Sequence, residues 1–160
     1  MNKSSHQDLK VIYLCSGLGG RFASEDTVTI DVDPRAKPDI IADVRHLPLR
    51  PDLKPKTLLM TPPCTFFTYA RPYPRPGIGK AFEILGACFE AINYLKPETW
   101  ILENPRNHLQ RILGKPKFGI RWKAFDTKAT HLFYSNMKSL KRAKFPPEIT
   151  LMLTSPDDGS

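Results

Sequence analysis

The stretch VIYLCSGLGG, residues 11–20, joins a short apolar run to a glycine-rich turn. The run at 11–15 has the length and the apolar character of a buried strand, and the glycines permit a sharp turn into a helix. The first N–H groups of such a helix are available to a ligand. By itself, the turn fits two interpretations, a nucleotide-cofactor cradle or an ordinary strand-to-helix connection.

Strand and helix patterns alternate along the chain after this turn. Strands are predicted at 27–32, 39–44, 57–60, 99–103 and 130–136, and helices at 79–95 and 107–113. Pro97 ends the longer helix, and Gly114 ends the shorter one. This order predicts an α/β, Rossmann-like fold with a mostly parallel sheet and helices on both faces.

The composition favours one folded domain. The chain has 160 residues, 41% of them hydrophobic, so we expect a single domain at 1–160 with flexible ends at 1–9 and 154–160. No run of about 18 apolar residues is present, and the polar N-terminus does not resemble a signal peptide, so we expect no membrane contact and a cytoplasmic location. The formal net charge of +8 fits a polyanionic partner or an ordinary basic protein.

Polar and reactive residues gather where the predicted strands end, at 15–20, 31–33, 43, 61–65 and 103–105. Ligands of parallel sheets bind at the carboxyl ends of the strands, so these clusters predict one shared site. Asp31 or Asp33 is placed to accept hydrogen bonds from ribose hydroxyls, although either could be a solvated loop acid. Asp43 is placed either to bind an adenine amine or to cap a helix.

The three cysteines have different surroundings. Their odd number and spacing argue against disulfides and against a zinc site, and the four histidines show no metal-ligand spacing, so no metal is expected. Cys64 follows two prolines in a stiff loop and is interpreted as a nucleophile, or else as a small structural residue. Cys88 is assigned to core packing, and Cys15 to packing or to the edge of a cofactor site. His108 and His131 are interpreted as surface or hydrogen-bonded residues.

Glu103 ends a hydrophobic strand, where a carboxylate is unusual unless it is paired or reactive. Its alternative role is to cap the helix that follows Pro105. Asn104 is a candidate for orienting the adjoining loop.

These segments together resemble the DNA (cytosine-5-)-methyltransferases. YLCSGLGG at 13–20, TIDVDP at 29–34 and DIIADV at 39–44 are similar to the family's three cofactor motifs. TPPCTFFTYA at 61–70 resembles the Pro-Pro-Cys motif, and WILENP at 100–105 resembles the Glu-Asn-Val motif. The order and the spacing agree from about residue 11 to residue 110.

The resemblance implies a methyltransferase fold with S-adenosyl-L-methionine as cofactor and DNA as partner. The implied catalytic residues are Cys64, Glu103 and Asn104. The implied cofactor contacts are Cys15, Ser16, Gly17, Leu18, Gly19, Gly20, Asp31, Val32, Asp43, Val44, Thr61 and Pro62. The implied substrate contacts are Pro63, Thr65, Arg71 and Arg75. In this chemistry the cysteine thiolate adds to cytosine carbon 6, while the glutamate holds the ring of a base that has been flipped out of the duplex.

The sequence also departs from the family. Thr65 replaces Gln, Thr68 replaces Ser, and Pro105 replaces Val. The Gln-x-Arg-x-Arg motif is not found, and residues 118–136 are its candidate variant, with Arg121, Lys123 or Lys128 as the basic groups.

About fifty residues follow the Glu-Asn-Pro segment, too few for the usual target-recognition domain. Base specificity would then need a partner chain, a homodimer, or the basic loop ARPYPRPGIGK at 70–80. Two alternatives stay open: the same chemistry on RNA or a free pyrimidine nucleotide, and a non-catalytic subunit that binds S-adenosylmethionine or nucleic acid.

Overall fold

The computed structural model describes residues 10–18, 23–70, 72, 74–122, 130–138 and 149–153. Its eight strands in these ranges are β1 (Val11–Leu14), β2 (Thr27–Asp31), β3 (Ile40–Ile41), β4 (Thr57–Met60), β5 (Thr99–Pro105), β6 (Phe118–Trp122), β7 (Thr130–Ser135) and β8 (Ile149–Leu153). The helices are α1 (Ile78–Leu95), α2 (Leu109–Leu113) and the 3-10 helices η1 (Pro34–Ala36), η2 (Val44–His46) and η3 (Pro51–Leu53).

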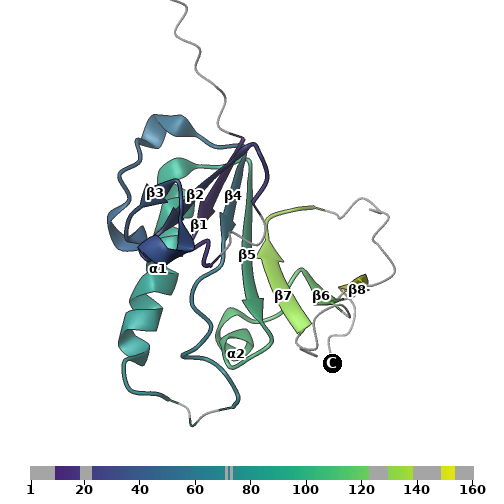
Figure 1. Ribbon diagram of the computed structural model, residues 1–160. Coiled ribbons are helices and arrows are strands. Elements are labelled where there is room, and N and C mark those ends of the chain that lie inside the picture. The colour runs from purple at the N-terminus through teal and green to yellow at the C-terminus, as the bar shows by residue number, and fades with distance from the viewer. Residues whose placement is uncertain are drawn as a thin grey trace, which may run out of the picture.

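All eight strands belong to one mixed sheet in the order β3-β2-β1-β4-β5-β7-β6-β8 (Figure 1). The first five strands in this order run parallel, and β7, β6 and β8 continue the sheet by antiparallel pairing. This confirms an α/β fold compatible with a Rossmann-like arrangement. The direction of winding reverses between β1 and β4, and this reversal is the position where open α/β sheets bind ligands.

One face of the sheet packs against α1. The register places Leu14, Ile30, Met60 and Leu102 side by side in one row, and all four are buried. The side chains of α1 that join the same core are Ala81, Leu85, Cys88, Ala91 and Leu95. Cys88 is therefore a core residue, as its sequence context predicts.

Local sequence signals explain several element boundaries. β4 has the predicted bounds, and α1 begins one residue earlier than predicted and ends before Pro97. β1 ends at Leu14 because Cys15 adopts a left-handed backbone conformation with φ of 55°. The predicted strand at 39–44 is reduced to two residues, because Asp43 caps η2 through the Arg45 backbone N–H.

Helices on both faces are not confirmed. α1 packs on one face, whereas α2 lies at the carboxyl end of β5 (Figure 1). The segment after β1, where the sequence predicts a turn into a helix, has turns at residues 15, 17, 18, 25 and 26, and its residues 19–22 lie outside the described ranges. The ends that were expected to be flexible, 1–9 and 154–160, also lie outside them. β6 and β8 are strands that the sequence patterns did not predict. Within the described ranges, no helix combines the length and the apolar character needed to cross a membrane.

Candidate active site

Four of the predicted site positions occupy one row at the carboxyl edge of the sheet. The pairs Leu14↔Ile30, Leu14↔Met60 and Met60↔Leu102 place the next residues of each strand at a common level. Those residues are Asp31 on β2, Cys15 directly after β1, Thr61 directly after β4 and Glu103 on β5. Three strand spacings of about 4.8 Å give roughly 14 Å from the Asp31 backbone to the Glu103 backbone.

Asp31, the last residue of β2, accepts a hydrogen bond from the glycine turn and so holds the turn beside this strand. Its Oδ2 accepts a hydrogen bond from the Gly17 N–H at 2.8 Å, and its Oδ1 accepts one from the Asp33 N–H at 2.8 Å. Gly17 has φ of 65°, and no heavy atom of the other described residues, apart from its chain neighbours, would lie within 4 Å of a Cβ at this position. The turn therefore presents its backbone to open space beside a carboxylate whose orientation is fixed.

The Asp33 side chain has other partners than the glycine turn. Its carboxylate caps η1 and forms an ion pair with Arg35 at 2.7 Å. The hydrogen bonds from Arg35 lower the pKa of Asp33 below its usual value. Of the two acids that the sequence leaves as alternatives, the geometry favours Asp31 as the residue beside the glycine turn.

Three residues adjacent to Asp31 or Gly17, in sequence or across the β2–β3 ladder, have exposed apolar side chains. Leu18 is 76% exposed, Val32 is 63% exposed, and Ile41 is 62% exposed. Leu18 follows Gly17, Val32 follows Asp31, and Ile41 pairs with Asp31 across the β2–β3 ladder. Ile41 was not among the predicted site residues, because the β2–β3 register that places it there is not visible in the sequence.

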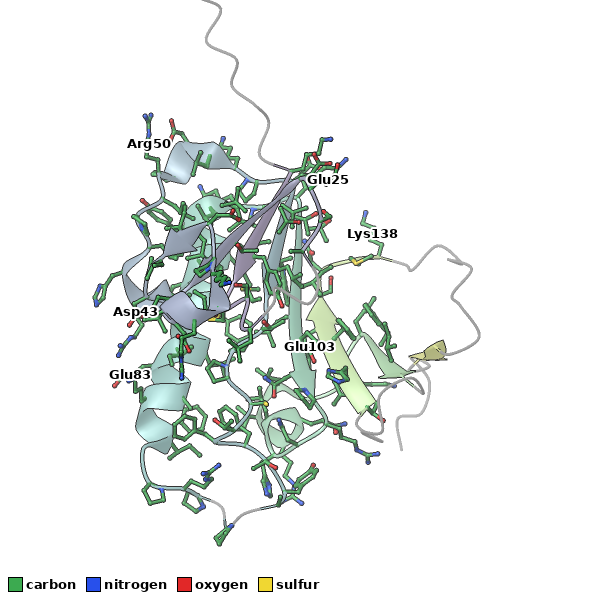
Figure 2. All side chains as sticks on the ribbon, in the orientation of Figure 1. Glu25, Asp43, Arg50, Glu83, Glu103 and Lys138 are labelled. Atoms are coloured by element: carbon green, nitrogen blue, oxygen red, sulfur yellow. The ribbon has the colours of Figure 1, made fainter. Side chains whose placement is uncertain are left out.

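Asp43 caps a helix, which is the second of the two roles that its sequence position allows. It caps η2 and forms an ion pair with Arg45 at 2.6 Å, and Arg45 also contacts Glu83 at 2.9 Å (Figure 2). The Arg45 side chain, which donates to this carboxyl group, lowers the pKa of Asp43 to about 2. The neighbouring Val44 is half-buried and packs against the core.

Thr61 connects the two strands at the winding reversal. Its hydroxyl donates to the Cys15 carbonyl at 2.6 Å and lies 3.1 Å from the Tyr13 hydroxyl, and its N–H donates to the Leu14 carbonyl at 3.1 Å. Ser16 is buried, and its N–H donates to the Ile30 carbonyl. The glycine turn is thus held from both β2 and β4, while Gly19 and Gly20 lie outside the described residues.

Cys15 turns its thiol toward α1. A hydrogen bond with the Cys88 side chain, together with burial, raises the pKa of Cys15 well above its usual value. A thiol held in this way is a poor nucleophile, because the reactive form is the thiolate. The structure therefore favours the packing interpretation of Cys15.

The loop that carries Cys64 is tied to the end of β5. The buried Asn104 side chain donates through Nδ2 to the Pro62 carbonyl at 2.9 Å and accepts through Oδ1 from Asn107 at 2.6 Å. Asn107 in turn accepts from the Leu109 N–H at 2.9 Å, at the start of α2. Asn104 thus orients the loop, in agreement with its predicted positioning role.

Further bonds fix the loop beyond the cysteine. The Phe67 N–H donates to the Cys64 carbonyl at 3.0 Å, and the Phe67 carbonyl accepts from the His108 N–H at 2.9 Å. The Tyr69 hydroxyl donates to the Asn107 carbonyl at 2.9 Å. These hydrogen bonds make the loop stiff. Cys64 on this loop forms no disulfide and is half-buried, so part of its surface is accessible.

Arg75 contacts its own loop in this conformation. Its Nη1 donates to the Thr65 carbonyl, and its guanidinium lies 5.8 Å from the centre of the Phe66 ring. The predicted substrate residues Pro63 and Thr65 are exposed near the cysteine, whereas Arg71 lies outside the described residues. Of the suggested basic groups of the variant motif, Lys123 and Lys128 also lie outside the described residues, and the Arg121 side chain is not described.

Glu103 pairs with a histidine that the sequence patterns did not single out as a site residue. Antiparallel pairing places Glu103 opposite Phe133 and Pro105 opposite His131, so the acid and the histidine are diagonal neighbours on one face. Glu103 Oε1 and His131 Nδ1 form a hydrogen bond, and both residues are buried. Glu103 does not cap α2, whose N-cap position is His108. Within the described residues, no cluster of three or more His, Cys, Asp or Glu could hold a metal ion.

No protein-family model and no curated protein matches the chain.

Proposed function

We propose that the chain transfers a methyl group from S-adenosylmethionine to carbon 5 of cytosine in DNA through a covalent Cys64 adduct. One observation carries the proposal. The winding reversal lies between the glycine turn with Asp31 on one side and the Cys64 loop with Glu103 on the other. A cofactor on the first side and a base on the second would meet at the sheet edge.

The residues around Asp31 fit the nucleoside part of the cofactor. A carboxylate at the end of the second strand accepts hydrogen bonds from ribose hydroxyls, and each oxygen of Asp31 has acceptor capacity beyond the backbone bond it already makes. The exposed side chains of Leu18, Val32 and Ile41 offer apolar surface for a purine ring. When it is bound, S-adenosylmethionine supplies an electrophilic methyl group.

Cys64 supplies the nucleophile in this reaction. The thiolate adds to carbon 6 of the cytosine ring and forms a carbon–sulfur bond, and the displaced electron pair makes carbon 5 nucleophilic. Carbon 5 then forms a bond to the methyl carbon, the bond between that carbon and the sulfonium sulfur breaks, and S-adenosylhomocysteine is the leaving group. Loss of the carbon 5 proton to a base returns the electron pair, the bond to Cys64 breaks, and the ring regains its double bond. Each adduct that forms is thus resolved, and Cys64 is regenerated.

Glu103 holds the base during these steps. Its hydrogen bond to His131 fixes the carboxyl group, and the second oxygen retains acceptor capacity for the exocyclic amine of cytosine, or for the ring nitrogen once that nitrogen carries a proton. A preorganised group of this kind stabilises the change in ring charge at low reorganisation cost. His131 acts through Glu103 and is a positioning residue.

The test is methyl transfer from radiolabelled S-adenosylmethionine to duplex DNA, RNA and cytidine nucleotides, followed by nucleoside chromatography. Label in 5-methyldeoxycytidine, lost in Cys64→Ala and retained in Cys15→Ala, supports the proposal. Label in 5-methylcytidine alone moves the substrate to RNA or a nucleotide. S-adenosylmethionine binding without transfer to any of the three substrates contradicts the catalytic assignment.

A further inference from the structure

The net positive charge of the chain lies almost wholly in its second part. Residues 104–160 contain 11 of the 24 lysines and arginines but only 4 of the 16 acidic residues. Residues 104–125 contain no Asp or Glu. This asymmetry concentrates positive potential over the segment that follows Glu103.

The basic residues at the start of this segment surround α2 and are exposed: Arg106, Arg111, Lys115 and Lys117. We call these four residues the α2 surface. In the first part of the chain, Arg35 and Arg50 each form an ion pair with a nearby carboxylate, at 2.7 Å and 2.5 Å. Arg106 and Arg111 form no ion pair with any residue that the structure describes. Their charge is therefore available to an external anion.

The α2 surface adjoins the Cys64 loop (Figure 1). Arg106 follows Asn104 by two residues, and its N–H donates to the Thr130 carbonyl of β7 at 2.7 Å, which fixes its backbone. The Phe67–His108 and Tyr69–Asn107 hydrogen bonds described above join the loop to the approach to α2.

An exposed aromatic ring lies at this junction. Tyr69 is 51% exposed, and its ring meets the edge of the His108 ring at 4.6 Å between centroids. Basic side chains interleaved with an exposed aromatic ring are typical of surfaces that follow a nucleic-acid strand.

We propose that the α2 surface binds the phosphodiester backbone of the strand whose base reaches Cys64. This inference rests on the proposed function, because it takes the substrate to be a nucleic acid. Contacts to phosphate fix the position and the orientation of a strand without reading its sequence. The surface would thus hold the backbone while the neighbouring loop receives the base.

The experiment measures the affinity of a short mixed-sequence DNA duplex over a series of salt concentrations, without cofactor and in a Cys64→Ala background. The variant Arg106→Gln/Arg111→Gln removes two exposed charges from the α2 surface. The matched control, Arg35→Gln/Arg50→Gln, removes two exposed arginines elsewhere and changes the net charge equally. Because the four side chains are exposed, thermal melting should show that both variants fold.

The expected result is a shallower salt dependence for the first variant alone. Two lost phosphate contacts should reduce the slope of log K against log salt by about 2, whereas the control slope should stay unchanged. Equal changes in both variants, or no change in the first variant with the duplex and with single-stranded DNA and RNA alike, would overturn the proposal. A loss seen with single-stranded DNA or RNA, and not with the duplex, retains the backbone contact and assigns it to that strand.

Failure of the reaction and failure of the surface can be told apart. A reduced slope in the Arg106/Arg111 variant, with no methyl transfer to any substrate, upholds the surface and contradicts the reaction. Methyl transfer to DNA, with an unchanged salt-dependence slope in the Arg106/Arg111 variant, upholds the reaction and contradicts the surface.

Discussion

At the scale of single residues, Asp31 and Asp33 are separated by one residue but have different partners. Asp31 accepts from the glycine turn, and Asp33 pairs with Arg35. The sequence could place both acids after β2, but it could not choose between them, because the choice depends on which side chain faces the β1 turn. The same limit explains why the sequence left the role of Asp43 open.

Exchanging each of these acids for its amide tests the choice. We expect Asp31→Asn to weaken S-adenosylmethionine binding by about tenfold or more, because charge-assisted hydrogen bonds contribute about 1.5–3 kcal/mol each. Asp33→Asn, which breaks an exposed ion pair, should leave the affinity within about twofold. Isothermal titration calorimetry measures both. A larger loss in Asp33→Asn would show that the ribose carboxylate has been misassigned.

The buried Glu103–His131 pair makes a second prediction at this scale. In His131→Leu the Glu103 carboxyl group loses its partner inside the protein, so we expect destabilisation of about 3 kcal/mol. Adding Glu103→Gln should restore part of that loss, because an amide carries no charge that needs a partner. Urea unfolding of the wild type, both single variants and the double variant gives the coupling energy. Additive effects would show that the two side chains do not interact in solution.

At the scale of elements, the loops after β4 and β5 behave as one unit. Asn104, near the end of strand β5, donates a hydrogen bond to the Pro62 carbonyl, two residues before Cys64. Because Asn104 is buried, its loss leaves a buried carbonyl without this donor and releases the loop. The position of Cys64 thus depends on a side chain from a different strand.

We therefore expect Asn104→Ala to lower kcat for methyl transfer by about 10- to 100-fold, since small displacements of a nucleophile are costly. The free energy of unfolding should fall by about 1–3 kcal/mol. S-adenosylmethionine binding should change little, since the hydrogen bonds of Asn104 are to Pro62 and Asn107 and not to Asp31 or the glycine turn. Steady-state kinetics, urea unfolding and calorimetry separate these effects. An unchanged kcat with reduced stability would restrict Asn104 to a purely structural role.

An element can be predicted from the sequence when its signal lies in neighbouring residues, and not when it depends on pairing with a distant segment. α1 and β4 follow from helical spacing, a stopping proline and a short apolar run, all of which are local. β6, β8 and the partnership of His131 with Glu103 depend on antiparallel pairing between distant segments. No local pattern encodes that register. The helix predicted after the glycine turn falls on residues 19–22, which lie outside the described ranges, and the described residues that flank them form no helix.

At the scale of the whole molecule, the charge and the chemistry are arranged along one edge of the sheet. Three features follow one another across β2, β1, β4 and β5: the glycine turn with Asp31, the Cys64 loop and the α2 surface. The end of this edge near β2 carries ion-paired arginines, and the α2 end carries arginines without ion pairs to the described residues. This order matches a reaction in which a nucleoside cofactor and a polyanionic strand approach from opposite ends.

The central claim is that Cys64 forms a covalent bond with cytosine, and a trapping experiment tests it most directly. The protein is incubated with S-adenosylmethionine and duplex DNA in which 5-fluorocytosine replaces cytosine in many sequence contexts. Fluorine cannot leave carbon 5 as a proton does, so a working cysteine stays bonded to the methylated base. Intact mass and peptide mapping should find the adduct on Cys64, with no adduct in Cys64→Ala and a normal adduct in Cys15→Ala. If S-adenosylmethionine binds but no adduct forms, or if the adduct maps to another residue, the account is contradicted.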